Sequence, residues 1–213
     1  MARVRVRQHV NPLSQQFQMP ITLPQWQEVY ADATRPLHLD LGCARGRFAM
    51  QMAQAEPEWN FLGLEIRKPL VDEANAWRDR EGLQNLHFLF CHVNHSLPGI
   101  LRSLPLGVLQ RVTILFPDPW FKKRHQKRRM VQSDVVHTLA AHLTEGCEVW
   151  IASDVGEVAV DMRDRFAAHP AFQPRSSEWI AENPFPVASE REIATLNKGE
   201  PVYRTVFLRC GIF

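Results

Sequence analysis

The sequence lacks the features that would assign a protein to a membrane, secretory or metal-binding class. Its 213 residues contain no hydrophobic run long enough to cross a membrane or to form the core of a secretory signal. Cysteine is scarce and forms no C-x-x-C pair, since the four cysteines are Cys43, Cys91, Cys147 and Cys210. These absences predict a cytoplasmic protein with reduced cysteines, no membrane partner and no bound metal.

Flexible linkers, internal repeats and low-complexity segments are also missing. The chain is 45% hydrophobic, which is enough to bury a substantial core. We therefore expect a single domain over residues 1–213, with residues 1–35 as a basic N-terminal arm and leading segment. The first ten residues, MARVRVRQHV, carry Arg3, Arg5 and Arg7. They fit either a basic arm or an exposed edge strand whose charges oppose aggregation.

Positive charge is concentrated in one segment. The whole chain has a net charge of +2, yet FPDPWFKKRHQKRR, residues 116–129, sets six Lys or Arg against one acid, Asp118. This segment therefore carries +5, and the rest of the chain sums to −3. A local patch on a near-neutral protein favours a directed contact with a polyanion over general stickiness.

Short apolar runs alternate with segments of helical periodicity along the chain. The runs predict strands at 37–42, 60–65, 86–91, 111–116 and 147–153, and an alternating run predicts a late strand at 202–210. Helices are predicted at 47–55, 69–80, 130–143 and 156–169, and Gly82 follows the second of them as a stop signal. This alternation predicts an α/β fold with a largely parallel, doubly wound, Rossmann-like sheet and a C-terminal antiparallel pair.

Polar and acidic residues follow four of these strands. Ligands bind such sheets at the carboxyl ends of the strands, so these positions are candidates for a site. Asp40 lies in the first strand, Glu65 ends the second, and Asp118 follows the fourth. The third strand ends near His92 and Asn94. Core packing alone would not place such residues at the end of four strands.

The turn after the first strand lacks the G-x-G-x-x-G pattern of dinucleotide-binding proteins. It reads DLGCARG, in which Gly42 is followed by Ala44 where the second glycine would stand. A pyrophosphate is therefore disfavoured. Asp40 suits a cationic amino group, and Glu65 lies at a suitable distance to accept the two hydroxyls of a ribose. Together they favour S-adenosylmethionine, although Asp40 could be a turn-satisfying acid and Glu65 a solvated strand end.

With these motifs in place, the chain resembles the bacterial tRNA (guanine-N7-)-methyltransferases. The likeness runs from about residue 36 to the end and rests on LDLGCARG, FLGLEIR, FPDPWFKKRHQKRR, ASD at 152–154, and SERE at 189–192 followed by PVYRT. The pattern P-D-P-W-x-K-x-R-H-x-K-R-R, satisfied throughout 117–129, is the most specific of these. The resemblance implies the class I S-adenosylmethionine-dependent methyltransferase fold, in one methyltransferase domain. It also implies formation of 7-methylguanosine in tRNA, at position 46 of the variable loop.

The resemblance assigns roles to individual residues. It implies cofactor binding by Asp40, Gly42, Glu65, His92, Asn94 and Asp118. It implies substrate binding by Lys122, Arg124, His125, Lys127, Arg128, Arg129, Asp154, Ser189, Arg191 and Glu192. The sequence departs from the family at three of these positions, with Asp40 for Glu, His92 for an Asp or Asn, and Ser189 for Thr. The second departure leaves the adenine contact open between His92 and Asn94.

The expected chemistry needs no catalytic base. Guanine N7 has a lone pair and no proton, so alignment of the reacting atoms is the main requirement. A carboxylate can face the positive charge that passes to the purine, which makes Asp118 the catalytic candidate, whereas its plain alternative is a cap on the following turn. Trp120 could stack on a base or only anchor its loop.

Two other classes of protein share some of these features. A nicotinamide-dependent dehydrogenase should have a glycine-rich first turn and no basic segment after the fourth strand. A non-catalytic RNA-binding domain would have no reason to align Asp40, Glu65 and Asp118. Members of the resembled family are monomers or homodimers, and the sequence does not choose between them.

Overall fold

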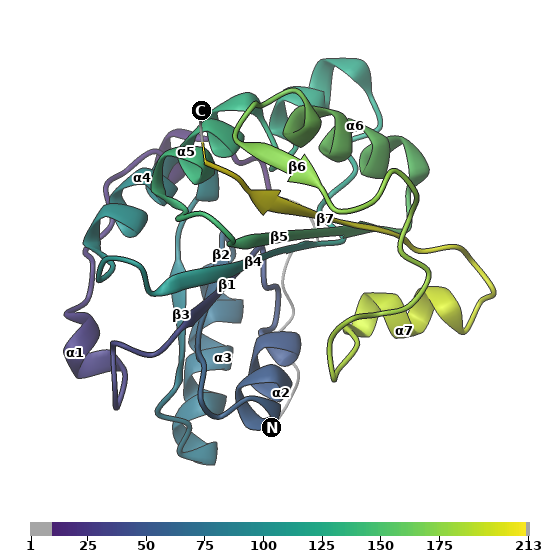
Figure 1. Cartoon of the computed structure of the whole chain (residues 1–213). Coiled ribbons are helices and arrows are strands. Elements are labelled where there is room, and N and C mark those ends of the chain that lie inside the picture. Colours follow the sequence, from purple (N-terminus) through teal and green to yellow (C-terminus); the bar gives the residue numbers. More distant parts are fainter. Residues whose placement is uncertain (1–9, 212–213) are drawn as a thin grey trace.

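A single mixed sheet forms the centre of the protein. The computed structural model describes residues 10–211, so Arg3, Arg5 and Arg7 of the expected basic arm lie outside the described residues. Within this range, seven strands pair in the order β3-β2-β1-β4-β5-β7-β6 (Figure 1). Their bounds are β1 Leu37–Leu41, β2 Asn60–Glu65, β3 Leu86–Phe90, β4 Leu109–Leu115, β5 Glu148–Ser153, β6 Phe172–Pro174 and β7 Tyr203–Arg209.

The pairing confirms the predicted doubly wound topology. β1 to β5 pair in parallel, and β7 pairs antiparallel with both β5 and β6. The chain order reverses between β1 and β4, because β2 and β3 extend the sheet on one side and β4 and β5 on the other. Every residue of β1 and β2 is buried, as expected for central parallel strands covered on both faces.

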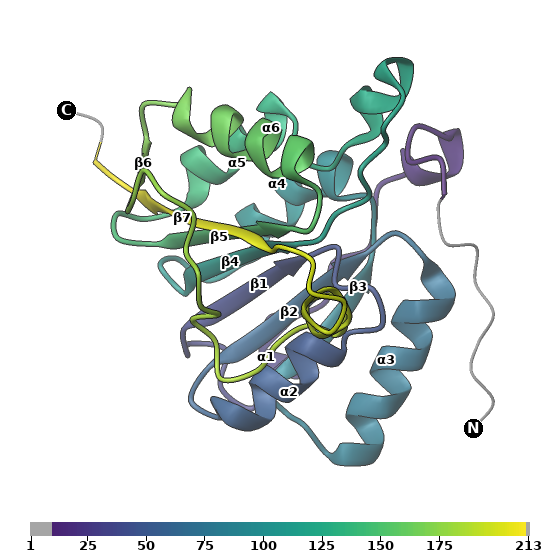
Figure 2. The ribbon, with the colours of Figure 1, turned by 90° about the vertical axis from the view of Figure 1, so that its right-hand side faces the viewer.

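Helices cover both faces of the sheet. α2 and α3 lie on one face, and α4, α5 and α6 on the other (Figures 1 and 2). Their bounds are α2 Arg47–Ala55, α3 Lys68–Glu81, α4 Val93–Ser103, α5 Ser133–His142 and α6 Gly156–Ala167. Three shorter helices are η1 Gln15–Phe17, α1 Trp26–Val29 and η2 Lys123–Arg128. None of the helices within residues 10–211 has the length and apolar character needed to cross a membrane.

α4 is a helix that the periodicity did not predict. Pro98 and Gly99 interrupt its sequence, and both residues have low helix propensity. Leu97, Ile100 and Leu101 are nevertheless buried in the core on the α4–α6 side of the sheet. Burial of this apolar face stabilises the helix by more than its low propensity costs. The sequence alone does not show this burial.

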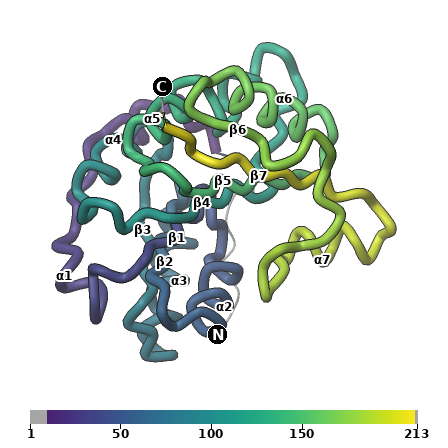
Figure 3. Tube along the Cα trace, in the orientation of Figure 1, coloured from purple at the N-terminus to yellow at the C-terminus, as the bar shows by residue number. Residues whose placement is uncertain are grey.

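The segment between β6 and β7 carries the last helix to the site. It leaves β6, passes to the α2 face of the sheet as α7 (Glu190–Leu196), and returns as β7 (Figures 2 and 3). An ion pair between Arg47 and Glu190 joins the beginnings of α2 and α7. Ser189 caps α7, since its hydroxyl accepts a hydrogen bond from the amide of Glu192 at 3.2 Å. α7 therefore begins next to the turn that follows β1.

Candidate active site

A cavity of about 640 Å³ opens at the carboxyl edge of the parallel strands. This volume is in the range of small-molecule sites. Its walls come from the segments that follow β1, β2, β3 and β4 and from the start of α7. The six residues predicted to bind cofactor all line it, namely Asp40, Gly42, Glu65, His92, Asn94 and Asp118. The fold thus brings together side chains that are up to 78 residues apart in the sequence.

The turn after β1 uses its amide groups within the protein. The amides of Gly42 and Cys43 donate to the carbonyl of Leu64 at 2.8 and 3.0 Å. The amide of Ala44 donates to Glu65 Oε2 at 2.9 Å, and that of Gly46 donates to the Cys43 carbonyl at 2.8 Å. These four amides are not available to cradle a phosphate, in contrast to a dinucleotide-binding turn.

Gly42 adopts a backbone conformation that favours glycine, and it lies close to Met130. Its φ of +80° lies in the left-handed region, and an added Cβ would come within 2.6 Å of Met130 Cε. A side chain here would also project into the cavity that Gly42 lines. With glycine at position 42, no side chain from this residue takes up space in the cavity.

Three residues other than glycine adopt left-handed backbone conformations in the described chain, and all three line this cavity. They are Ala44, Phe116 and Trp120, with φ of 51°, 50° and 43°. Such a conformation costs roughly 1–3 kcal/mol for a residue with a side chain, and such strain gathers at ligand sites. No sequence pattern signals this cluster, because strain is a property of the folded backbone.

Asp40 is held by a buried polar chain that crosses from β1 to β4. Thr113, its register partner on β4, donates its hydroxyl to Asp40 Oδ1 at 2.8 Å. The same hydroxyl lies 3.0 Å from His38 Nε2, and Arg111 Nη1 lies 3.5 Å from His38 Nδ1. Burial, together with the charge of Arg111, holds the pKa of His38 well below its usual value, so the ring is neutral. Its hydrogen bonds assign the proton to Nε2, which donates to Thr113.

The Asp40 carboxyl is strongly perturbed by this environment. Burial raises its pKa to about 7, the Thr113 hydrogen bond opposes that rise, and the charge of Glu65 adds to it. An unfolded aspartate releases its proton at a pH of about 4. Between these values the folded protein holds a proton that the unfolded chain has lost, so stability should fall as the pH rises through this window.

We expect Asp40→Asn to flatten this pH dependence. Asparagine keeps a hydrogen-bond acceptor for Thr113 but cannot ionise. Between pH 4 and pH 7 the wild-type protein should lose roughly 3 kcal/mol of unfolding free energy through Asp40, and the variant should not. Urea unfolding of both ligand-free proteins at several pH values measures the difference. Parallel pH profiles would show that Asp40 is ionised in the folded protein throughout the range.

Glu65 is buried and accepts hydrogen bonds on both of its carboxylate oxygens. Only 3% of its side chain is exposed. Arg67 contacts it through its backbone amide at 3.0 Å and through Nε at 2.8 Å and Nη2 at 3.1 Å. The protein itself therefore already surrounds the carboxylate, and its contact with a ribose stays a prediction.

The two candidates for an adenine contact both line the cavity, in different settings. The side-chain amide of Asn94 donates to the Met130 carbonyl at 3.0 Å, which ties the start of α4 to the loop after η2. His92 Nδ1 lies 3.4 Å from Gln18 Nε2 in the leading segment. Burial and the neighbouring His95 lower the pKa of His92. The choice between the two residues stays a prediction.

Asp118 lies on an irregular loop between β4 and η2. Phe116 and Trp120, on either side of it, have the left-handed conformations described above. Its side chain is exposed and lines the cavity. The guanidinium carbon of Arg128 lies 5.0 Å from the centroid of the Trp120 ring, and the His125 ring meets the same indole edge to face at 5.9 Å. Trp120 thus anchors the loop, whatever else it contacts.

The remaining basic residues after Asp118 form an exposed surface beside the cavity. Lys122, Arg124 and Lys127 are exposed, while Arg128 is half-buried and lines the cavity. Partial burial and the adjacent Lys and Arg charges lower the pKa of His125, so it offers a neutral ring. η2 forms most of this segment, which we call the basic segment (Lys122–Arg128), and Arg128 brings its end to the cavity.

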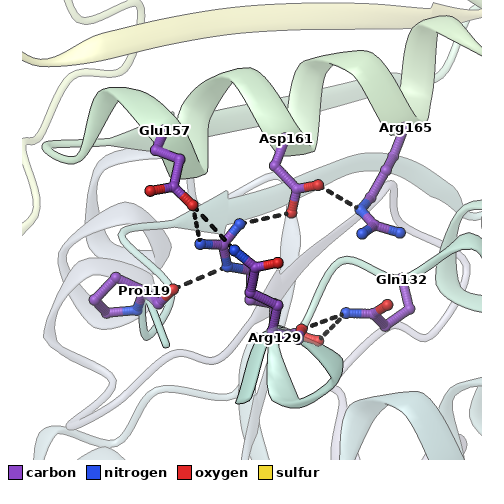
Figure 4. Close-up of polar contacts among 7 residues, drawn as sticks. Pro119, Arg129, Gln132, Glu157, Asp161 and Arg165 are labelled. Carbon is purple, nitrogen blue, oxygen red and sulfur yellow. Dashed lines mark hydrogen bonds and ion pairs between the residues drawn. The ribbon is translucent and has the colours of Figure 1, made fainter. Parts of the chain in front are cut away.

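Arg129, the last residue of the predicted tRNA-binding run, differs from the exposed basic residues before it. Its side chain is only 5% exposed and faces α6 (Figure 4). Its guanidinium donates to the Pro119 carbonyl at 2.9 Å, to Glu157 at 2.8 Å and to Asp161 at 3.1 Å. With these donors engaged and water excluded, Arg129 holds the loop to α6, and a phosphate contact by this residue stays a prediction.

Glu192, another predicted substrate-binding residue, is paired within the protein. It is buried, and its Oε1 accepts hydrogen bonds from Arg204 Nε at 3.1 Å and Nη2 at 2.5 Å. Asp154 is paired with Arg191 at 2.7 Å and lies outside the cavity lining. Ser189 and Arg191 do line the cavity. The structure therefore assigns Glu192 to an internal ion pair that fixes α7 against β7.

The cavity also contains residues that the sequence did not single out. Arg45, Arg47, Arg67 and Met130 line it, and Arg45 pairs with Glu73 on α3. The FLGLEIR motif includes Arg67, but its spacing gives no sign that the side chain folds back onto Glu65. No group of three or more His, Cys, Asp or Glu between residues 10 and 211 is arranged to hold a metal ion.

Solved structures of other proteins share the fold of this chain. TrmN from Thermus thermophilus has a TM-score of 0.57 at 18% identity, covering 82% of this chain and 45% of that chain. The 16S rRNA (adenine(1408)-N(1))-methyltransferase from Catenulisporales acidiphilia, solved with its cosubstrate SAM, has a TM-score of 0.54 at 18% identity, covering 88% of this chain and 91% of that chain. The fold is that of the class I S-adenosylmethionine-dependent methyltransferases.

Sequence relatives define the family within this class. A family model described as "Putative methyltransferase" matches residues 34–205. The tRNA (guanine-N(7)-)-methyltransferase of Synechococcus elongatus is 62% identical over 209 residues, 98% of each chain. That of Trichormus variabilis is 60% identical over 207 residues, 97% of this chain and 96% of its own. The chain belongs to the bacterial tRNA (guanine-N7-)-methyltransferase family.

Proposed function

We propose that the protein transfers a methyl group from S-adenosylmethionine to N7 of a guanine in tRNA, at position 46 of the variable loop. One observation carries the proposal: a cavity walled by Asp40, Glu65 and Asp118 opens beside the exposed basic segment. The cavity suits a cationic nucleoside, and the segment suits a polyanion. The names of relatives that are 54–62% identical over nearly their whole length support the same activity.

The cavity fits this cofactor on two counts. In the turn after β1, the backbone amides of residues 42, 43, 44 and 46 are bonded within the protein and cannot bind a phosphate. S-adenosylmethionine contains no phosphate, so it does not need them. Asp40 and Glu65 would hold its ammonium and ribose ends, with His92 or Asn94 at the adenine. When bound, the cofactor supplies a methyl group on a positively charged sulfur.

The residues of the protein then have to align the guanine and balance charge. Guanine N7 presents a lone pair, so no side chain needs to remove a proton. Asp118, at the edge of the cavity, would face the charge that passes to the purine or accept from the Watson–Crick edge of the guanine. Arg128 stacks on Trp120, which lies two residues after Asp118 in the same loop.

The basic segment would hold the tRNA by its phosphates. Each phosphate contact releases counterions, so affinity falls as salt rises. Such contacts position the RNA, whereas the cavity selects the base. Asp154, Ser189 and Arg191 are proposed to complete the substrate side from β5 and α7, with Ser189 and Arg191 at the cavity wall.

We expect the triple variant Lys122→Ala, Arg124→Ala, Lys127→Ala to lower the salt dependence of tRNA binding. Three lost phosphate contacts should reduce the slope of log affinity against log salt by about two to three. Filter binding over a series of salt concentrations measures this slope. Arg102→Ala is the control, because α4 runs away from the cavity and places this exposed arginine at its far end. Equal slopes in the triple variant and the wild type would remove the basic segment from the interface.

The proposed position can be tested with one atom. A tRNA transcript with 7-deazaguanine at position 46 lacks the N7 lone pair but keeps the shape and pairing edge of guanine. We expect the protein to methylate the guanine transcript and to bind both transcripts equally. If the transcript with 7-deazaguanine is methylated as fast as the guanine transcript, the methyl acceptor is not N7 at position 46. The expected single domain, cytoplasmic location and monomeric or dimeric state stay predictions.

A further inference from the structure

Glu65 has no acceptor position left for a ligand in this structure. A carboxylate has about four lone-pair sites. Oε1 accepts from the Arg67 amide at 3.0 Å and from Arg67 Nε at 2.8 Å. Oε2 accepts from the Ala44 amide at 2.9 Å and from Arg67 Nη2 at 3.1 Å. A ribose that donates two hydroxyls to Glu65 must therefore displace two of these four donors.

The four donors differ in how easily they can leave. The amides of Ala44 and Arg67 belong to turns fixed by the ends of β1 and β2. The guanidinium of Arg67 is carried on a long side chain that lines the cavity and is 21% exposed. It provides the other two hydrogen bonds, which equals the number of hydroxyls on a ribose.

We propose that the Arg67 guanidinium occupies the diol-binding sites of Glu65 in the ligand-free protein and is displaced by the ribose hydroxyls of the cofactor. This inference rests on the proposed function and goes beyond it, since it makes Arg67 an internal competitor. Without the guanidinium, the buried Glu65 carboxylate of the ligand-free protein would have only two hydrogen-bond partners, the amides of Ala44 and Arg67. Its loss from Glu65 on binding sets the affinity below what the cavity could otherwise reach.

We propose that the displaced guanidinium moves toward Asp118. Asp118 lines the same cavity on the substrate side. Burial lowers the pKa of Arg67, but the hydrogen bonds and charge of Glu65 and the charge of Asp118 together raise it. The Asp118 charge therefore already acts on the Arg67 side chain, and both residues line the cavity. Cofactor binding would shift positive charge from the buried side of the cavity toward Asp118.

The test separates the diol from the rest of the ligand. Binding of S-adenosylhomocysteine and of its 2′,3′-dideoxy analogue is measured by calorimetry for the wild type, Arg67→Met and Arg67→Lys. Arg67→Met should bind the diol ligand about tenfold more tightly than the wild type and the dideoxy ligand equally, because only the diol competes with the guanidinium. Arg67→Lys offers one compact donor group and should give a smaller gain of the same sign.

A control variant and two different contradicting results separate the role of Arg67 from the proposed methyl transfer. Arg45→Met removes another arginine of the cavity, one that pairs with Glu73, and should leave the ratio of diol to dideoxy affinity unchanged. Unchanged or weaker diol binding by Arg67→Met, or by Arg67→Lys if the methionine variant does not fold, would show that Arg67 supports Glu65 in the complex, and would overturn the inference. A wild type that binds neither ligand would instead contradict the proposed function.

Discussion

Replacement of Asp118 with alanine should lower methyl transfer to tRNA by about two to three orders of magnitude while changing tRNA affinity by less than about threefold. The side chain is exposed and lines the cavity. It would face the charge that develops on the guanine, and that contribution exists mainly in the transition state. Single-turnover rates with labelled cofactor, together with filter binding of tRNA, measure both quantities.

Two further variants sharpen this test. Asp118→Glu keeps the charge but moves it by one methylene, and should recover part of the rate only if position and charge both contribute. Lys122→Ala, four residues on in the basic segment, should show the reverse pattern, with weaker tRNA binding and a nearly normal single-turnover rate. Equal losses of rate and affinity in Asp118→Ala would reassign Asp118 to tRNA binding.

Replacement of Glu192 with glutamine should destabilise the protein by about 3–5 kcal/mol, because it leaves a buried guanidinium without its carboxylate. Arg204 is 5% exposed on β7 and donates two hydrogen bonds to Glu192 Oε1. The additional bond from Arg204 Nη1 to the Ala181 carbonyl, at 2.8 Å, cannot balance the charge. Urea unfolding measures the loss.

The neighbouring Glu190 provides a matched control for Glu192. Its partner is Arg47, and both side chains are about half exposed. Glu190→Gln should therefore change the unfolding free energy by less than about 1 kcal/mol. A stable Glu192→Gln variant that has lost tRNA binding would contradict the structural role and return Glu192 to the substrate-binding residues.

Much of the fold follows from the sequence because central parallel strands are buried along their whole length. LHLDL and NFLGLE are uniformly buried, and each was recognisable as an apolar run. The helix stop at Gly82 was also local information, since this residue adopts a φ of 66° at the end of α3. The convergence of Asp40, Glu65 and Asp118 followed from topology, because parallel strands bring their carboxyl ends to one edge.

The parts that could not be predicted depend on partners distant in sequence. Arg129 has the same identity and spacing as the exposed basic residues before it, but its acidic partners lie 28 and 32 residues later on α6. Only packing of the loop against α6 separates a buried structural arginine from a phosphate-binding one. Glu192 and Arg67 are similar cases, since motif membership does not tell whether a charge is already paired within the protein.

The central claim is that the chain methylates N7 of guanine in tRNA, and nucleoside analysis of a labelled product tests it most directly. Unmodified bulk tRNA is incubated with the protein and methyl-labelled S-adenosylmethionine, then digested to nucleosides and separated. We predict that the label appears in 7-methylguanosine and that Asp118→Ala greatly reduces it. Label in any other nucleoside would contradict the account. So would the absence of label in every nucleoside when the protein binds both cofactor and tRNA.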